Sequence, residues 1–138
     1  MNAIIFRLNR ESLLFHEYDA LLEKEWGNKE RSDAFLDVPK PIALVIDNDL
    51  IGGLAFTRFK SPENNETALW INTVLVKPGY RGHGYASRLI NEAVSAAGEF
   101  GASSLFVYTE IPRLYTNLGW VVLSNDGAFS VLKTKLST

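Results

Sequence analysis

A glycine-rich segment in the middle of the chain, Arg81-Gly82-His83-Gly84-Tyr85-Ala86, holds the residues best suited to chemistry. A glycine-rich turn ahead of a helix presents free backbone N–H groups at the positive end of the helix dipole, and such a place binds phosphate. Gly82 and Gly84 allow a ligand to approach the backbone closely, and Arg81 supplies a planar cation that suits a phosphate. A tight structural turn could use the same residues, so the surrounding sequence has to decide between the two.

Two familiar nucleotide-binding loops do not match this segment. Gly79 and Gly84 have the outer spacing of a P-loop, but Tyr85 and Ala86 stand where its lysine and hydroxyl residue are required. A dinucleotide-binding loop would follow the first strand of the fold, whereas this one lies in mid-chain, with Ser87 at the position of the third small residue. The sequence therefore favours neither ATP nor a dinucleotide.

The composition sets limits on the class of protein. With 138 residues, 46% of them hydrophobic and 22% charged, the chain is expected to form a single domain over residues 1–138. Its 14 basic and 16 acidic side chains give a net charge of −2, which argues against nucleic acid as a partner. The absence of cysteine excludes disulfides and thiolate ligands, and with only two histidines no metal site is predicted.

The chain carries no apolar run of about 18 residues, and its first residues lack the basic and apolar layout of a signal peptide. We therefore expect a cytoplasmic protein that does not enter the membrane. The sequence leaves open whether it is a monomer or a homodimer.

The elements around the glycine-rich segment can be predicted from hydrophobic periodicity. Thr67 to Val76 is nearly continuous in apolar and β-branched residues, which predicts a central strand buried on both faces. Apolar residues recur at helical spacing from Tyr85 to Phe100, and Ser104 to Thr109 reads as another strand. The glycine-rich segment would then join strand to helix within a right-handed βαβ crossover.

The rest of the chain is expected to complete one sheet. On its N-terminal side the pattern predicts a strand at 4–6, a helix at 12–26, a short helix from Lys29 to Leu36, and strands at 43–46 and 50–59 with a bulge at Gly52-Gly53. On its C-terminal side it predicts a short helix at 112–118 and a hairpin formed by strands 120–123 and 128–133.

With these elements in place, the segment from Val74 to Leu89 resembles motif A of the GNAT acetyltransferases, whose pattern Arg/Gln-x-x-Gly-x-Gly/Ala is matched by Arg81 to Ala86. The later segment from Leu114 to Trp120 resembles the Tyr-x-x-Leu-Gly-Phe/Trp motif of that family. The resemblance extends to the order of elements over nearly all of the chain. It implies the α/β (α+β) fold of the acyl-CoA N-acyltransferases, with a mixed central sheet of six to seven strands flanked by about four helices.

The resemblance also implies that acetyl-CoA is the co-substrate and lies in a cleft where the central strand splays from its neighbour. Backbone groups of Val74 and Val76 would bond the pantetheine arm, and the amides of Gly82 to Ala86 would receive the pyrophosphate. His83 would line the coenzyme surface. The full set of predicted coenzyme-binding residues is Val74, Leu75, Val76, Arg81, Gly82, His83, Gly84, Tyr85 and Ala86.

The activity that the resemblance implies is direct transfer of the acetyl group to a primary amine of a small molecule or a peptide. The backbone amide of Val74 or Leu75 would stabilise the oxyanion, and Tyr115 matches the tyrosine that protonates the departing thiolate in many members. A buried aromatic on a short helix is the alternative role for Tyr115.

The general base is less well defined by the sequence. Many relatives carry a carboxylate on the central strand, but here Asn72 stands near that position and cannot accept a proton. A water held by Asn72 could relay the proton to Glu110 or Glu66, or the amine could bind in its neutral form. Because of Asn72, a non-catalytic acetyl-CoA-binding regulatory protein remains the alternative function. A weak resemblance to N-terminal acetyltransferases around Glu25-Trp26 and from Thr109 to Tyr115 leaves the kind of amine open.

Overall fold

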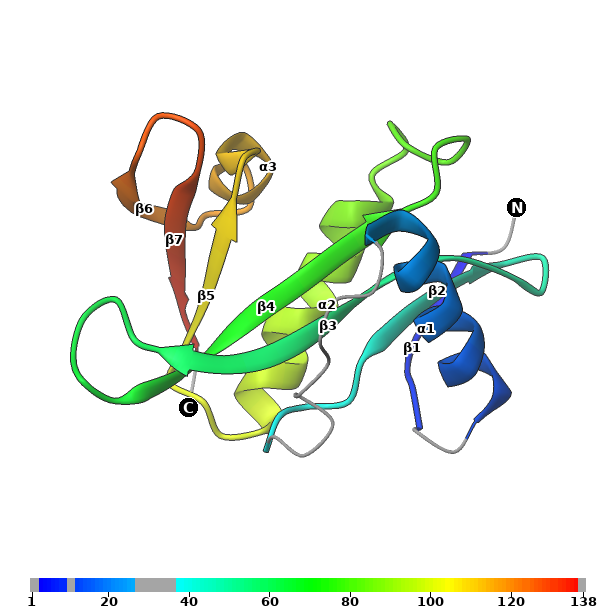
Figure 1. Cartoon of the computed structure of the whole chain (residues 1–138), viewed down its shortest axis with the longest axis horizontal. Coiled ribbons are helices and arrows are strands. Elements are labelled where there is room, and N and C mark those ends of the chain that lie inside the picture. Colours follow the sequence, from blue (N-terminus) through cyan, green and yellow to red (C-terminus); the bar gives the residue numbers. More distant parts are fainter. Residues whose placement is uncertain (1–2, 10–11, 27–36, 137–138) are drawn as a thin grey trace.

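The computed structural model describes residues 3–9, 12–26 and 37–136, and the predicted helix at Lys29–Leu36 lies outside them. The described residues form one seven-stranded sheet and three helices (Figure 1). In chain order the elements are β1 (Ala3–Arg7), α1 (Leu13–Trp26), β2 (Ile42–Ile46), β3 (Asp49–Lys60), β4 (Thr67–Val76), α2 (Tyr85–Glu99), β5 (Ser104–Thr109), α3 (Pro112–Thr116), β6 (Val121–Asn125) and β7 (Ser130–Lys135).

The sheet is mixed, and its strand order is β1-β2-β3-β4-β5-β7-β6. All neighbouring strands are antiparallel except β4 and β5, which are parallel and joined by α2. This arrangement confirms the predicted mixed sheet of six to seven strands and the crossover at its centre. Where about four helices were predicted, three lie within the described residues.

Helices cover both faces of the sheet. The amphipathic α2 buries Leu89, Ile90 and Ala93 against one face, where they join the main hydrophobic core. Helix α1 lies on the opposite face (Figure 1), and its Tyr18 packs into a smaller apolar cluster over β2, β3 and β4. Because the core on the α2 side also contains Tyr115, the short α3 belongs to the same layer as α2.

The glycine pair in β3 has a role that differs from the predicted one. The register between β2 and β3 shifts so that Ile51 is the extra residue, and the bulge therefore lies just before Gly52. A Cβ on Gly52 would overlap the Leu75 carbonyl oxygen, and one on Gly53 would overlap the Tyr18 ring. The prediction of a bulge at Gly52-Gly53 was thus wrong by one residue, because these glycines permit close approach of β4 and α1.

The burial of β4 changes along its length. Leu69, Trp70 and Ile71 are buried, but Asn72 is exposed and Val74 is only half-buried. The prediction of a strand buried on both faces therefore holds only for part of β4. The reason is that β4 and β5 diverge after Ile71, so the next residues of β4 border open space.

None of the helices in the described part of the chain has the length and the apolar run that crossing a bilayer requires. Within the same residues, no three His, Cys, Asp or Glu side chains are grouped so that they could hold a metal ion.

Candidate functional site

A cleft opens between the carboxyl-terminal halves of β4 and β5. The two strands pair only at Trp70 with Phe106 and at Ile71 with Val107, and beyond these pairs they separate. The cleft has a volume of about 540 Å³. Its walls come from β4, β5, the start of α2, α3 and the hairpin of β6 and β7: Ile71, Asn72, Val74, Leu75, Val76, Arg81, Ala86, Val107, Tyr108, Thr109, Glu110, Ile111, Leu114, Tyr115 and Phe129.

A bulge in β4 sets the position of Asn72. Ala55 of β3 pairs with Thr73, and the next residue of β3 pairs with Ile71, so Asn72 has no partner in the register. A bulged residue leaves the alternation of the strand, and here it lines the cleft. Glu110 also lines the cleft, whereas Glu66 lies in the loop between β3 and β4 and lines a separate hollow. The structure therefore brings Asn72 and Glu110 to the same cleft and places Glu66 outside it.

The glycine-rich loop has the backbone that phosphate binding requires. Gly82 and Gly84 adopt φ angles of 82° and 81°, in the left-handed region that favours glycine. Gly84 is the N-cap of α2 and no side chain caps the helix, so its first N–H groups have no intrahelical or side-chain acceptor. A Cβ at either glycine would meet no other atom within 4 Å, so the space above the loop is open to a ligand.

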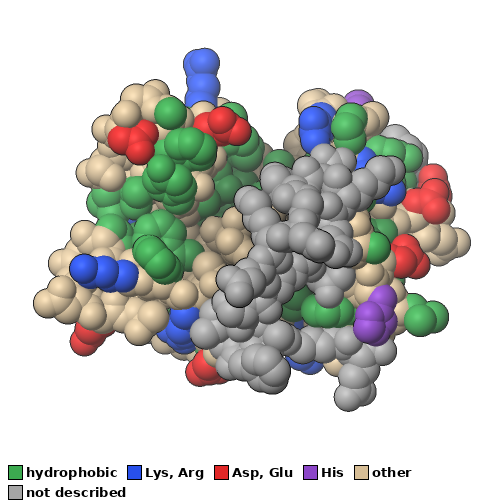
Figure 2. Space-filling view, viewed as in Figure 1, with side chains coloured by type: hydrophobic (Ala, Val, Ile, Leu, Met, Phe, Trp, Pro, Cys, Tyr) green, Lys and Arg blue, Asp and Glu red, His purple; other side chains and the backbone are tan. Residues whose placement is uncertain are grey.

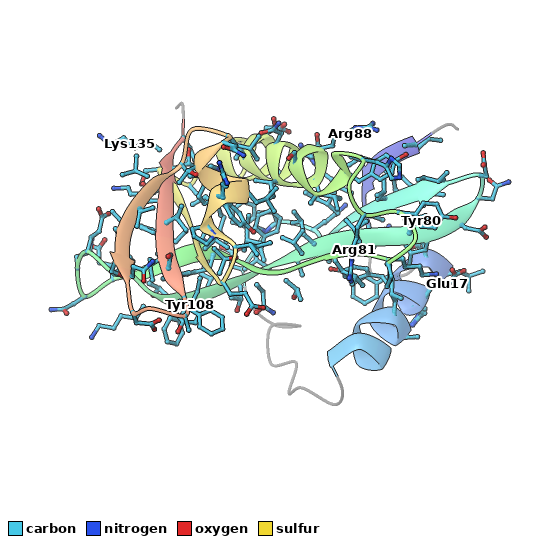
Figure 3. All side chains as sticks on the ribbon, turned by 90° about the horizontal axis from the view of Figure 1, so that it is seen from above. Glu17, Tyr80, Arg81, Arg88, Tyr108 and Lys135 are labelled. Carbon is cyan, nitrogen blue, oxygen red and sulfur yellow. The ribbon has the colours of Figure 1, made fainter. Side chains whose placement is uncertain are left out.

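Arg81 joins this loop to the cleft. Its Nε donates a hydrogen bond to the Val76 carbonyl at 2.7 Å, which fixes the guanidinium between the end of β4 and the start of α2 (Figure 3). No described residue accepts a hydrogen bond from the two terminal nitrogens of Arg81, so both can reach an anion. Arg88, in the first turn of α2, instead donates a hydrogen bond to the Ala3 carbonyl at 3.5 Å.

The predicted coenzyme-binding residues fall into two groups. Five of them line the cleft, namely Val74, Leu75, Val76, Arg81 and Ala86. The other four lie beside it, Gly82, His83 and Gly84 in the loop and Tyr85 at the first position of α2, and the ring centroids of His83 and Tyr85 are 6.0 Å apart. Their role in coenzyme binding stays a prediction.

Tyr115 lines the cleft from α3 and is only 3% exposed. Its ring meets Trp120 edge to face at 5.1 Å, while no described residue forms a hydrogen bond with its hydroxyl. Burial raises the pKa of Tyr115 well above its ordinary value near 10, so the phenol stays protonated at neutral pH. Tyr115 is therefore both a core aromatic and a residue of the cleft.

Local sequence explains how Tyr115 is held. Pro112 begins α3, where its missing N–H costs no hydrogen bond, and Gly119 ends the segment with a φ angle of 94°. This turn brings the Trp120 amide back to the Tyr115 carbonyl at 3.1 Å. The Leu-Gly-Trp sequence thus packs Trp120 against Tyr115.

Sequence reasoning missed two aromatic residues of the cleft, Tyr108 and Phe129. Their rings are stacked, with centroids 4.6 Å apart and planes 6° apart. Alternation in β5 could have placed Tyr108 on the face away from α2, but no short-range pattern pairs it with a residue 21 positions later. The contact depends on the register of β5 with β7.

The comparisons with known proteins agree with this architecture. A family model described as "Acetyltransferase (GNAT) family" matches residues 5–120. Among solved structures, an IAA acetyltransferase from Bacillus cereus is similar with a TM-score of 0.74 and 17% identity, over 98% of this chain and 100% of the other. The yncA protein of Salmonella typhimurium, solved with its cofactor acetyl-CoA, is similar with a TM-score of 0.73 and 15% identity, over 100% of this chain and 96% of the other.

Arabidopsis thaliana Naa50, in complex with the bisubstrate analogue CoA-Ac-MVNAL, gives a TM-score of 0.71 and 13% identity over 97% of this chain and 99% of the other. At these identities the likeness of structures shows the fold alone. A comparison with curated proteins found no match.

Proposed function

This chain belongs to the acetyltransferase (GNAT) family, and we propose that it transfers the acetyl group of acetyl-CoA directly to a primary amine of a small molecule or a peptide. Acetyl-CoA is the co-substrate of the family. The observation that carries the proposal is the position of Arg81. Its side chain is hydrogen-bonded to the Val76 carbonyl, beside a loop whose glycines have positive φ angles, and it lines the same cleft as Tyr115.

The residues of the loop fit a diphosphate. The uncapped N–H groups at the start of α2 and the free terminal nitrogens of Arg81 would hold its charge. From there the pantetheine arm would run along the unpaired side of β4 and bond backbone groups of Val74 and Val76, as an added strand would. The thioester would then lie near Tyr115.

The transfer needs one bond to form and one to break. The neutral amine attacks the thioester carbonyl, the C–N bond forms, and the C–S bond breaks. The amide of Val74 or Leu75 would stabilise the oxyanion, and the Tyr115 hydroxyl would give its proton to the departing sulfur and regain one from solvent. A thiol has an ordinary pKa of about 8.5, and burial raises the pKa of Tyr115. We therefore expect the rate enhancement from proton donation by Tyr115 to lie at the lower end of the range for general acids.

The amine must also lose a proton. Asn72 cannot accept one, but its amide can orient a water that passes the proton toward Glu110, which lines the same cleft. Neither group needs to be a strong base if the amine enters the cleft uncharged.

The test combines binding with turnover. Calorimetry should show that acetyl-CoA binds, and thiol release should be detected with at least one member of a panel of small amines and short peptides. Arg81→Ala should weaken coenzyme binding by about 10- to 100-fold because charge-assisted hydrogen bonds are lost.

Arg88→Ala is the matched control, since it removes the same charge from the first turn of α2, outside the cleft. No binding of acetyl-CoA by the folded protein would refute the proposal. Binding without thiol release on the whole panel would instead support the regulatory alternative.

A further inference from the structure

The cleft is electrically asymmetric. Among the described residues that line it, Arg81 is the one cation and Glu110 the one carboxylate. Arg81 lies in the loop that precedes α2, and the helix dipole adds positive potential at the start of α2. Glu110 follows the carboxyl end of β5, on the wall formed by the other strand. One part of the cleft therefore suits an anion, and another suits an ammonium group.

The stacked rings of Tyr108 and Phe129 lie beside the acidic part. Tyr108 is 53% exposed although its ring stacks on that of Phe129. It projects from the sheet face opposite α2 (Figure 3), and hydrophobic side chains gather on that face over β5 and β7 (Figure 2). A pair of aromatic rings that lines a cleft and stays open to solvent presents a flat apolar surface to a ligand.

Asp126 holds this pair in place. Its carboxylate accepts hydrogen bonds from the amides of Ala128 and Phe129 at 3.1 Å and 2.7 Å, and from the Tyr108 hydroxyl at 3.2 Å. The turn between β6 and β7 is thereby fixed on the end of β5. The aromatic surface is preorganised, so little ordering is needed when a ligand binds to it.

Resting on the proposed function, we propose that the acceptor is a primary amine borne next to a large flat apolar group, with the amine near Glu110 and the apolar group against the Tyr108–Phe129 pair. Charge complementarity supports an amine as the ligand, because a primary amine is a cation in neutral water and the Glu110 carboxylate in the cleft attracts it. Small aromatic amines and peptides that begin with an aromatic residue share this chemistry.

The experiment measures acceptor selectivity as a ratio of kcat/KM values. One pair of acceptors is 2-phenylethylamine and ethanolamine, and the second is two tetrapeptides that differ only in beginning with Phe or with Gly. We expect the aromatic member of at least one pair to be favoured by about 10- to 100-fold, the range for burying one large apolar group. The pair that shows the preference distinguishes a small-molecule acceptor from a peptide.

Variants of the aromatic pair test the assignment. Phe129→Ala and Tyr108→Ala should reduce the preference toward unity through a raised KM for the aromatic acceptor, while Tyr108→Phe should retain it because the ring remains. Phe59→Ala is the matched control, since Phe59 is an exposed aromatic on β3 that does not line the cleft. Melting temperatures of all variants exclude loss of the fold.

Each result bears on the inference. Equal kcat/KM values within both pairs would overturn it, as would a preference that survives both alanine variants. Either result would leave the transferase function intact, because thiol release would still be observed. If acetyl-CoA binds but no acceptor is used, the proposed function fails, and the inference that rests on it fails too.

Discussion

The Tyr115 hydroxyl is an unusual polar group for a buried residue, since no described side chain or backbone group forms a hydrogen bond with it. Although the Tyr115 ring is buried, its hydroxyl oxygen keeps some exposure to the cleft, in which a ligand could supply a hydrogen-bond partner. Sequence alone identified Tyr115 from its motif, but the lack of a partner depends on the packing of Trp120 and α3. The role that we propose for Tyr115 uses both facts.

Replacing Tyr115 with Phe removes the hydroxyl that would donate the proton and keeps the aromatic ring and its packing. We expect turnover to fall by about 10²-fold, at the low end of the 10²–10⁴-fold range of general acids, because burial makes this phenol a weak acid. The affinity for acetyl-CoA and the melting temperature should change little, since the hydroxyl has no protein partner to lose. Steady-state thiol release on an identified acceptor measures the effect.

Tyr80→Phe is the control for Tyr115→Phe, because Tyr80 lies outside the cleft and lines a hollow next to Glu17 and Lys77. An unchanged kcat for Tyr115→Phe, with chemistry shown to be rate-limiting, would leave Tyr115 with a packing role only.

At the scale of the elements, the strand, loop and helix around the site could be predicted well. The β-branched run of β4, the glycines of the loop and the apolar repeat of α2 are local signals. The β4 bulge at Asn72 and the early end of its pairing with β5 could not be predicted, because both depend on register with other strands. Yet these two irregularities create the cleft.

The loop between β4 and α2 offers a prediction that a second glycine with a positive φ angle can control. Gly84→Ala should weaken acetyl-CoA binding by about tenfold or more, because a methyl group would stand in the open space above the uncapped helix. It should also lower the free energy of unfolding by about 1–2 kcal/mol, the cost of a left-handed conformation with a side chain. Calorimetry and denaturant unfolding measure the two effects.

Gly101→Ala controls for backbone strain. Gly101 lies beyond the other end of α2, has a similar positive φ of 98°, and would likewise meet no atom with its Cβ. It should lose comparable stability but keep its affinity for acetyl-CoA. Equal affinities in the two variants would show that the phosphates do not bind at this loop.

At the scale of the whole molecule, the family, the mixed sheet and the crossover follow from two motifs and the order of elements, and the family match and the sheet topology confirm them. The acceptor site that we propose does not follow in the same way. Its walls combine Asn72, Glu110 and the pair of Tyr108 with Phe129, which come from three separate parts of the chain. Only the tertiary structure brings these residues together, so the spacing of sequence motifs carries no information about them.

The stability of the whole domain should depend on pH through Tyr115. Its pKa is raised in the folded protein, so as pH rises the unfolded chain loses this proton first, at about pH 10. The stability of the fold is therefore unaffected by Tyr115 ionisation below pH 10 and declines above it, by up to about 1.4 kcal/mol per pH unit. Tyr115→Phe removes this pH dependence and leaves the other tyrosines unchanged. Urea unfolding of both proteins between pH 8 and pH 11 should show that the stability of the wild type falls more steeply above pH 10. Parallel curves would mean that Tyr115 ionises in the folded protein as easily as in the unfolded chain, and that its environment is wetter than its burial indicates.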